Sequence, residues 1–227
     1  MLKFYYAPLS PNARRVWITL LEKGIDFEAI LLKLNGDQLQ SEFLQLNPFH
    51  HIPVIVDDGF RVIESLAILD YLESKYPTPT LLPSDSQALA KVRMLQMVTA
   101  NELFPKTIPL ICESPDSSQF VQAVKHINTV LQFFTEIIGD RPFFVGEQLT
   151  LADIVAGTVL PFLPNLGVGL NDYPQLQNWC EHIQQRPAWQ KTQLSDADFE
   201  EFQRRVRFLV RLHRREMNKN HQGDENK

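Results

Sequence analysis

Cysteine is scarce in this sequence, and it lacks both an excess of basic residues and a long apolar run. The two cysteines, Cys112 and Cys180, lie far apart with no CxxC spacing, which indicates neither a disulfide framework nor a zinc site. No stretch approaches the roughly 20 apolar residues that span a bilayer, and the N-terminus shows no signal-peptide pattern. The net charge of −5 argues against general nucleic-acid binding. We expect a cytoplasmic protein without metal, nucleic-acid or membrane partners.

The first third of the chain alternates strand and helix patterns. Short apolar runs are separated by helical periodicities and by turn signals rich in Asn, Pro, Asp and Gly. The order β-α-β-α-β-β-α predicts a small mixed sheet with helices on its faces. Strands are expected over Leu2–Ala7, Phe27–Leu34, Val54–Val56 and Phe60–Ile63, and helices over Pro11–Lys23, Ser41–Leu46 and Ser65–Tyr76.

The pattern changes after Pro77. A proline-rich linker, residues 78–84, separates an expected α/β domain over residues 1–77 from an expected all-α domain over residues 85–217. Residues 218–227 are polar and lack aromatic side chains, which is typical of a disordered tail. Helices of the second domain are expected over residues 87–113, 118–138, 150–160, 174–185 and 196–217.

One segment, residues 45–77, places polar side chains beside strong structural signals. Pro53 forces an extended backbone directly before the apolar run Val54–Val56. Glu64 and Ser65 then open an amphipathic helix, in which Ser65 is a natural N-cap and Glu64 is not needed for capping. A proline beside a strand and a free acid beside a helix N-terminus indicate a site for a small, charged, peptide-like ligand.

Two further polar clusters have plain structural interpretations. Ser10 followed by Pro11 is typical of an N-cap and the first residue of a helix. The adjacent His50 and His51 are poor evidence for a metal, because no Cys, Asp or Glu stands at ligand spacing. A functional role for either cluster needs a further argument.

That argument comes from a resemblance. The chain resembles the cytosolic glutathione transferases in three ordered motifs: LSPNARRVWITLLEKGIDFE (9–28), NPFHHIPVIVDDGFRVIESLAILDYLESKYP (47–77) and RPFFVGEQLTLADI (141–154). The resemblance covers residues 2–190; the middle motif is most similar to the delta and theta classes, and the first is also similar to the zeta class. It implies a thioredoxin-like α/β domain followed by an all-α domain, glutathione as co-substrate, no metal, and a homodimer.

The resemblance implies roles for residues around the first strand. Ser10 stands four residues before Arg14 and matches the serine that hydrogen-bonds the glutathione sulfur in serine-type members. Tyr5 and Tyr6 are the alternatives, because tyrosine-type members keep their activating hydroxyl at the end of this strand, and alternation puts the two side chains on opposite faces. Asn12 replaces a cysteine of the zeta motif, which disfavours zeta-type cis–trans isomerase activity.

It also assigns glutathione-binding residues in the middle motif. Pro53 matches the family's cis-proline, which lets the Ile52 backbone pair with the cysteinyl part of the tripeptide as an added strand would. Glu64 and Ser65 match the pair that holds the γ-glutamyl amine and carboxylate at a positive helix end. His50 matches the histidine that contacts the glycine carboxylate.

The chain departs from the family patterns in three ways. Gln38 stands where delta-like members carry another histidine. Leu66 follows the Glu-Ser pair where those members have arginine, so one carboxylate contact is missing. The first domain has no cysteine, which disfavours the omega and beta classes.

The all-α domain is expected to supply the pocket for the electrophile. Apolar residues near helix ends are the candidates, although most such residues belong to a core: Leu103, Phe104, Leu110 and Phe162. Thr150 and Asp153 form a capping box, which we interpret as structural. Asp153→Ala is therefore expected to cost about 0.5–2 kcal/mol of stability.

The sequence thus predicts a glutathione transferase that joins the glutathione thiolate to hydrophobic electrophiles, a detoxification reaction. A non-catalytic glutathione- or ligand-binding protein, and a glutathione-dependent isomerase or peroxidase, stay open as alternatives. The last predicted helix carries six arginines over residues 204–215 after an acidic first turn. We interpret this pattern as a solvated face with i,i+4 ion pairs, and an anion- or partner-binding patch is its alternative.

Overall fold

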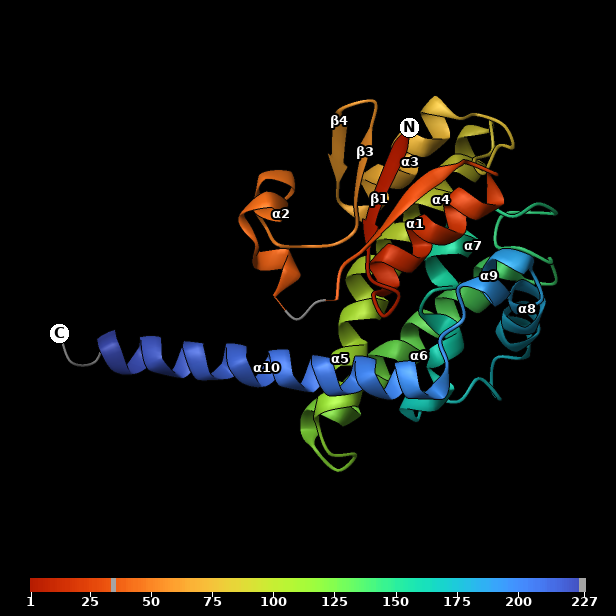
Figure 1. The fold of residues 1–227 in the computed structure, drawn as a ribbon. Coiled ribbons are helices and arrows are strands. Elements are labelled where there is room, and N and C mark those ends of the chain that lie inside the picture. The colour runs from red at the N-terminus through yellow and green to blue at the C-terminus, as the bar shows by residue number, and fades with distance from the viewer. Residues whose placement is uncertain (34–35, 225–227) are drawn as a thin grey trace.

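A four-stranded mixed sheet organises the N-terminal part of the computed structural model, which describes residues 1–33 and 36–224 (Figure 1). The strand order is β2-β1-β3-β4, in which β1 pairs in parallel with β2 and antiparallel with β3, and β3 and β4 form a hairpin. The strands are β1 (Leu2–Tyr6), β2 (Phe27–Leu31), β3 (Val54–Asp57) and β4 (Phe60–Ile63). The predicted order of elements is confirmed, but β2 ends at Leu31, before the predicted end at Leu34, which itself lies outside the described residues.

Helices lie on both sides of this sheet. α1 (Pro11–Glu22) and α3 (Ser65–Lys75) pack against each other beside the sheet, and α2 (Ser41–Leu46) lies on the other side (Figure 1). The alternation of β1 explains the layering, because Tyr6 contacts Trp17 of α1 and Tyr5 faces Phe43 of α2.

The rest of the described chain is helical, as the loss of strand pattern after Pro77 predicts. The helical stretch predicted over residues 87–113 is present, but it is not one α-helix, because Pro105 has no N–H to donate to an α-helical ladder. The chain instead passes through a π turn (Thr99–Leu103) and a 3₁₀ turn (Phe104–Lys106) between α4 and α5. The helices are α4 (Ser86–Val98), α5 (Thr107–Cys112), α6 (Ser118–Ile138), α7 (Leu151–Ala156), α8 (Pro174–Gln184), α9 (Pro187–Lys191) and α10 (Asp196–Asp224).

Two helix ends differ from the prediction by several residues. α7 stops at Ala156, and its C-cap Gly157 packs so closely against Ile183 that a Cβ there would lie 2.7 Å from the Ile183 Cδ1 atom. α10 continues through Asp224, beyond the predicted end at Met217; residues 225–227 lie outside the described part of the chain. The polar run after Met217 contains no proline, and extending an existing helix needs no new nucleus.

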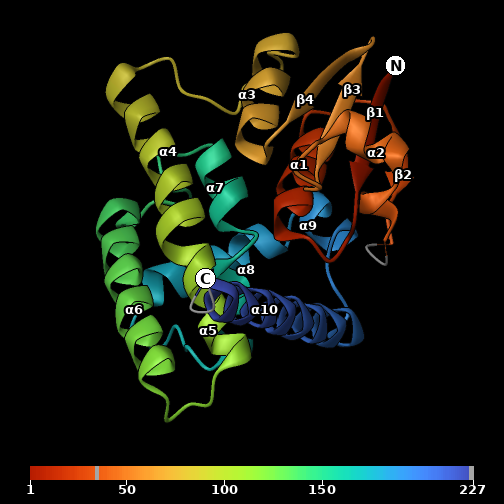
Figure 2. The same cartoon turned by 90° about the vertical axis from the view of Figure 1, so that its left-hand side faces the viewer.

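α10 is the element that departs most from a compact outline. It crosses beside α5 and then extends away from the other helices (Figure 1), and a view turned by 90° looks along its axis (Figure 2). Across the described ranges, no helix has the length and apolar character required to cross a membrane.

Buried polar contacts join the sheet-containing part to the helical part. The Arg186 guanidinium donates two hydrogen bonds, of 2.9 and 2.6 Å, to the Glu22 carboxylate at the end of α1. Arg14 donates from Nε to Thr192 Oγ1 at 3.3 Å. These contacts, with the packing of α1 against α7 and α9, hold the two parts in a fixed arrangement.

Candidate functional site

Ser10 lies at the junction between β1 and α1. Its Oγ accepts a hydrogen bond from the Ala13 N–H at 3.2 Å, and Pro11 follows as the first helical residue, so Ser10 is the N-cap of α1. A hydroxyl has one donor and two acceptor positions. The cap uses an acceptor position, so the Ser10 O–H can still donate to an external acceptor such as a thiolate.

The two alternative hydroxyls, those of Tyr5 and Tyr6, belong to rings used in packing. The Tyr6 ring stacks on Phe4 with centroids 4.8 Å apart and meets Trp17 edge-on at 5.1 Å. The Tyr5 ring lies 6.3 Å from that of Phe43. Both rings are half-buried, and they point to opposite faces of the sheet as predicted.

The loop before β3 is organised by a residue that the sequence analysis did not single out, Asn47. This side chain is fully buried, donates to the His51 carbonyl at 2.8 Å and accepts from the Phe49 N–H at 3.0 Å. The His50 N–H also donates to the Asn47 carbonyl at 3.1 Å, and His50 has a positive φ of 60°. An asparagine two residues before a chain reversal is a known Asx-turn signal, so the sequence contained the clue.

Ile52 and Pro53 follow this loop and lead into β3. Their peptide bond is cis, Pro53 is buried, and Ile52 is half-buried. In residues 1–33 and 36–224, neither the N–H nor the C=O of Ile52 makes a hydrogen bond to the protein. A short extended peptide could therefore pair with this backbone as an added strand.

Glu64 and Ser65 form the N-terminus of α3, with one difference from the prediction. The N-cap is Glu64, not Ser65, and its side chain makes no capping hydrogen bond. Glu64 is exposed and has φ 66°, a left-handed conformation that costs free energy in a residue other than glycine. Ser65 is the first helical residue and is buried. The uncapped N–H groups at this end can bind an anion.

Gln38 and His50, the expected contacts for the glycine end, lie on separate loops. Gln38 belongs to a 3₁₀ turn, Asp37–Leu39, and its Oε1 atom is buried without a hydrogen-bond partner in the described residues. Because an amide can present either its oxygen or its NH₂ by a flip, this group can accept from or donate to a ligand. His50 is exposed.

An apolar cavity adjoins Ser10. Leu9 and Pro11, the two neighbours of Ser10, contribute to its wall together with side chains from five helical segments between Phe104 and Phe202. The ring of Phe162 stacks on that of Phe199 from α10 with centroids 5.4 Å apart and planes inclined by 10°. The remaining lining residues are Phe104, Thr107, Thr158, Val159, Leu166, Leu194 and Phe202.

This cavity separates the four predicted pocket residues into two pairs. Phe104 and Phe162 line it, whereas Leu103 and Leu110 are buried in the hydrophobic core. The sequence analysis missed Phe199 and Phe202, because on a helix crowded with charges they have the spacing of an ordinary core-facing stripe.

Arg14 lies behind the cavity. It is buried, and its guanidinium carbon lies 5.3 Å from the centroid of the Phe162 ring. Burial lowers the pKa of Arg14 to about 10, and burial likewise lowers the pKa of the neighbouring Arg15 to about 10. Both side chains therefore stay positively charged at neutral pH. They lie on α1 within two turns of Ser10.

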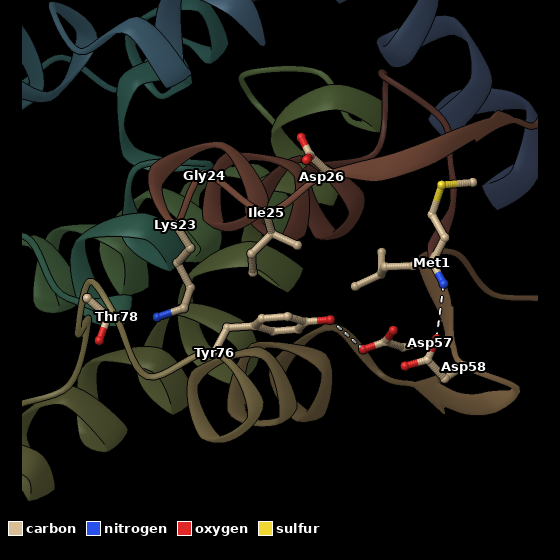
Figure 3. A pocket seen from close by; sticks show the side chains of 10 residues that line it. Met1, Lys23, Gly24, Ile25, Asp26, Asp57, Asp58, Tyr76 and Thr78 are labelled. Atoms are coloured by element: carbon tan, nitrogen blue, oxygen red, sulfur yellow. Dashed lines mark hydrogen bonds and ion pairs between the residues drawn. The ribbon is translucent and has the colours of Figure 1, made fainter.

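A second, larger pocket lies at the other end of β1, around Met1 and Tyr76 (Figure 3). Several of its polar groups are paired within the protein. Tyr76 donates from Oη to Asp57 Oδ2 at 2.8 Å, and the Met1 amino group contacts Asp58 Oδ1 at 3.0 Å. Lys75 also lies 2.8 Å from Asp57. This pocket lies at the end of β1 opposite to Ser10.

Comparison with known proteins matches both parts of the chain to one family. The N-terminal domain of glutathione S-transferase matches residues 4–80, and the C-terminal domain of glutathione S-transferase matches residues 95–187. The chain belongs to the glutathione transferase family. Both matches end before α10 begins, so the family pattern does not cover that helix.

Relatives and solved structures of this family cover most of the chain. It is 35% identical over 208 residues to glutathione S-transferase 3 of Zea mays, which covers 84% of this chain and 92% of the relative. It is 32% identical over 170 residues to maleylacetoacetate isomerase of Rattus norvegicus, covering 72% and 79%. An epsilon-class glutathione transferase from the housefly, Musca domestica, superposes with a TM-score of 0.78 at 25% identity, covering 91% and 97%.

Proposed function

We propose that this glutathione transferase activates glutathione through Ser10 and attacks hydrophobic electrophiles held in the adjoining cavity. The observation that carries the proposal is that both chain neighbours of Ser10, Leu9 and Pro11, line that cavity. A thiolate hydrogen-bonded to the Ser10 hydroxyl would therefore face an apolar space. Ser10 acts as a donor and is never itself deprotonated.

A hydrogen bond from Ser10 is strong enough to make thiolate the major form of glutathione at neutral pH. A cysteinyl thiol has a pKa of about 8.5, so only a few per cent is ionised at neutral pH. A hydrogen bond to a charged acceptor contributes about 1.5–3 kcal/mol, and a helix N-terminus adds about 0.3–1 kcal/mol. At 1.36 kcal/mol per unit, the thiol pKa falls by about 1.5–3 units. The buried cations Arg14 and Arg15 act in the same direction, so thiolate becomes the major form.

The rest of the tripeptide is assigned to the three features built around β3 and α3. The Ile52 backbone pairs with the cysteinyl residue, and the N-terminus of α3 holds the γ-glutamyl carboxylate through Ser65. Glu64 holds the γ-glutamyl amine, and His50 and Gln38 reach the glycine carboxylate. The free backbone groups of Ile52 and the uncapped N-terminus of α3 support this assignment.

Substitution of Ser10 tests the proposal. Because Ser10→Ala removes the donor, we expect turnover of a model aryl halide to fall by about one to two orders of magnitude. The pKa seen in the pH–rate profile should rise, and retention on immobilised glutathione should survive. Ser10→Thr, which keeps a hydroxyl, should recover part of the activity.

Ser117→Ala is the matched control for the lost N-cap. Ser117 caps α6 by accepting from the Phe120 N–H at 3.1 Å, so its loss costs similar stability without touching the sulfur. If Ser10→Ala turns over the aryl halide as fast as Ser117→Ala, the activating hydroxyl belongs to Tyr5 or Tyr6. If the wild-type protein binds glutathione but attacks no aryl halide, isothiocyanate or hydroperoxide, it is a binding protein.

An isomerase function is the second candidate, supported by the similarity to the rat maleylacetoacetate isomerase. Asn12 in place of the zeta-type cysteine argues against it. Conversion of a cis dienoic diacid in the presence of glutathione would decide for the isomerase. The delta, theta or zeta class, a homodimeric assembly, a cytoplasmic location and a role in detoxification are proposals that rest on the resemblance to the family.

A further inference from the structure

The outer face of α10 exposes apolar side chains that have no partner in the described structure. Phe208 is 61% exposed, Leu209 60% and Leu212 38%. The inner face of the same helix, with Phe199, Phe202 and Val206, already packs against the core. Phe208 and Leu212 lie on the side of the helix away from these three residues, and Leu209, seven residues after Phe202, lies between the two sides. Packing against the body leaves all three exposed.

The exposed apolar residues lie within a strongly basic stretch of α10. Residues 202–215 contain six arginines and no acidic residue, whereas the other residues carry 27 acidic side chains against 16 basic ones, since the chain has 22 Lys and Arg in total. The rest of the protein is thus strongly acidic. The basic charge is concentrated on the one element that extends away from it (Figure 1).

Five of the six arginines fall into two groups, and the sixth, Arg204, pairs with Glu201 on the same helix. Arg205 donates to the Lys33 carbonyl at 2.8 Å, Arg207 donates to the Ile111 carbonyl at 2.9 Å, and Arg214 pairs with Glu113, so these three fasten α10 to the body. Arg211 and Arg215 are exposed, and neither has an ion-pair partner among the side chains of residues 1–33 and 36–215. Arg211 follows the exposed Phe208 by three residues, and Arg215 follows the exposed Leu212 by three residues. Residues at this spacing are neighbours on the surface of a helix.

We propose that this outer face, defined as Phe208, Leu209, Leu212, Arg211 and Arg215, binds the anionic surface of a lipid bilayer. Exposed Phe and Leu next to arginines form the pattern of a helix that lies in the interface between headgroups and acyl chains. The helix would lie on the membrane surface without crossing it, and this binding would be a second property beside the proposed glutathione transferase activity. It differs from the expectation that the protein has no membrane partner.

A lipid surface fits this face better than nucleic acid or an acidic protein surface. Phosphate backbones offer no apolar layer for three large exposed side chains, whereas the bilayer interface accepts both kinds of group. Repulsion from the acidic body is limited, because exposed charges further apart than about 8 Å are largely screened at physiological salt. Each arginine near an anionic surface raises partitioning about fivefold, so we expect weak and reversible binding.

Vesicle co-sedimentation of the full chain tests the proposal. We expect the protein to sediment with vesicles of phosphatidylcholine and phosphatidylglycerol but not with phosphatidylcholine alone, and binding should weaken as salt increases. Combining Phe208→Gln, Leu209→Gln and Leu212→Gln should lower the partition coefficient at least tenfold. The pair Arg211→Gln and Arg215→Gln should lower it about 25-fold, at fivefold per charge.

The matched control is the pair Val121→Gln and Lys125→Gln, which removes an exposed apolar group and a charge four residues apart on α6. This variant should bind vesicles like the wild type. All variants should turn over a small water-soluble electrophile normally, since none touches Ser10 or the cavity, and this separates the inference from the proposed chemistry. Equal binding to neutral vesicles, or no vesicle binding by the wild type, overturns the inference. So does self-association that the glutamine variants abolish, which would assign this face to a second copy of the chain.

Discussion

The glutathione side of the proposed site and the cavity beside it are built in different ways. Most of the glutathione side comes from one stretch of chain, residues 47–65, and it consists of backbone groups, a strained loop and a helix N-terminus. The cavity consists of side chains from the loop after β1, the turns around residues 104 and 162, and α10. In the proposed function, the first side would bind glutathione mainly through backbone groups, and the cavity would surround the electrophile with apolar side chains.

The two sides are therefore expected to differ in how well they tolerate amino-acid substitutions. Backbone geometry on the glutathione side tolerates few substitutions, because His50 and Glu64 hold positive φ angles. The cavity can be reshaped by single side chains without disturbing the sheet.

The largest effect is expected at Asp153, which supports the helical side. Its buried carboxylate accepts hydrogen bonds from the N–H groups of Phe144 and Thr150, both at 2.9 Å, from Trp179 Nε1 at 3.0 Å and from Thr150 Oγ1 at 2.7 Å. Asp153→Ala would leave three buried N–H donors unpaired, so we expect a loss of about 3–5 kcal/mol, more than a capping box alone implies. Urea denaturation measures this loss.

The control for this prediction is a second capping box on the surface. Ser195 donates from N to Asp198 Oδ2 at 3.1 Å at the start of α10, where both residues are exposed or half-exposed. Asp198→Ala should cost about 0.5–1 kcal/mol. Because Arg14 and Arg186 join the two parts, we expect Asp153→Ala to unfold in one transition. Two transitions, with glutathione retention surviving the first, would show that the glutathione side is stable without the helical side.

The second effect is expected at Glu64, on the glutathione side. Glu64→Gln keeps the shape of the side chain but removes the charge proposed to hold the γ-glutamyl amine. Losing a charge-assisted hydrogen bond of about 1.5–3 kcal/mol should raise the KM for glutathione about 10- to 150-fold. Steady-state kinetics with each substrate varied in turn measures this change, and the KM for the electrophile should stay the same. An equal rise in both KM values would contradict the separation of the two sides.

The smallest effect is expected at Phe202, on the cavity side. Phe202→Ala opens the cavity wall and removes part of a half-buried ring, so we expect the KM for a hydrophobic electrophile to rise about tenfold. The KM for glutathione should not change. Phe208→Ala, on the outer face of the same helix, is the control and should alter neither value. A Phe202→Ala enzyme with unchanged electrophile kinetics would place the electrophile elsewhere.

The sequence predicted the glutathione side in more detail than the cavity side. Ser10 is the N-cap of α1 as its Ser-Pro sequence indicates, and β3, β4 and α3 begin where turn and proline signals place them. The N-cap of α3 was predicted as Ser65 and is Glu64, because a positive-φ residue at that position cannot be recognised from side-chain preferences. The hydrogen bonds of the Asn47 side chain to His51 and Phe49 were not predicted, although an asparagine before a chain reversal is a known Asx-turn signal.

The cavity was predicted less well for a physical reason. Leu103 and Phe104 are adjacent, yet one faces the core and the other lines the cavity, because neighbouring residues on a helix point about 100° apart. Phe199 stacks on Phe162, 37 positions earlier, and shares the cavity wall with Leu9, 190 positions earlier, and no local pattern records such separations.

By itself, the sequence determined the order of strands and helices and the N-cap of α1. These depend on interactions between residues only a few positions apart, which periodicity, prolines and capping residues record directly. The tertiary structure decided which apolar side chains leave the core to form the cavity, and it showed that α10 both closes that cavity and exposes a second face. Those outcomes depend on packing between distant segments, where burial and volume, not local preference, select the contacts.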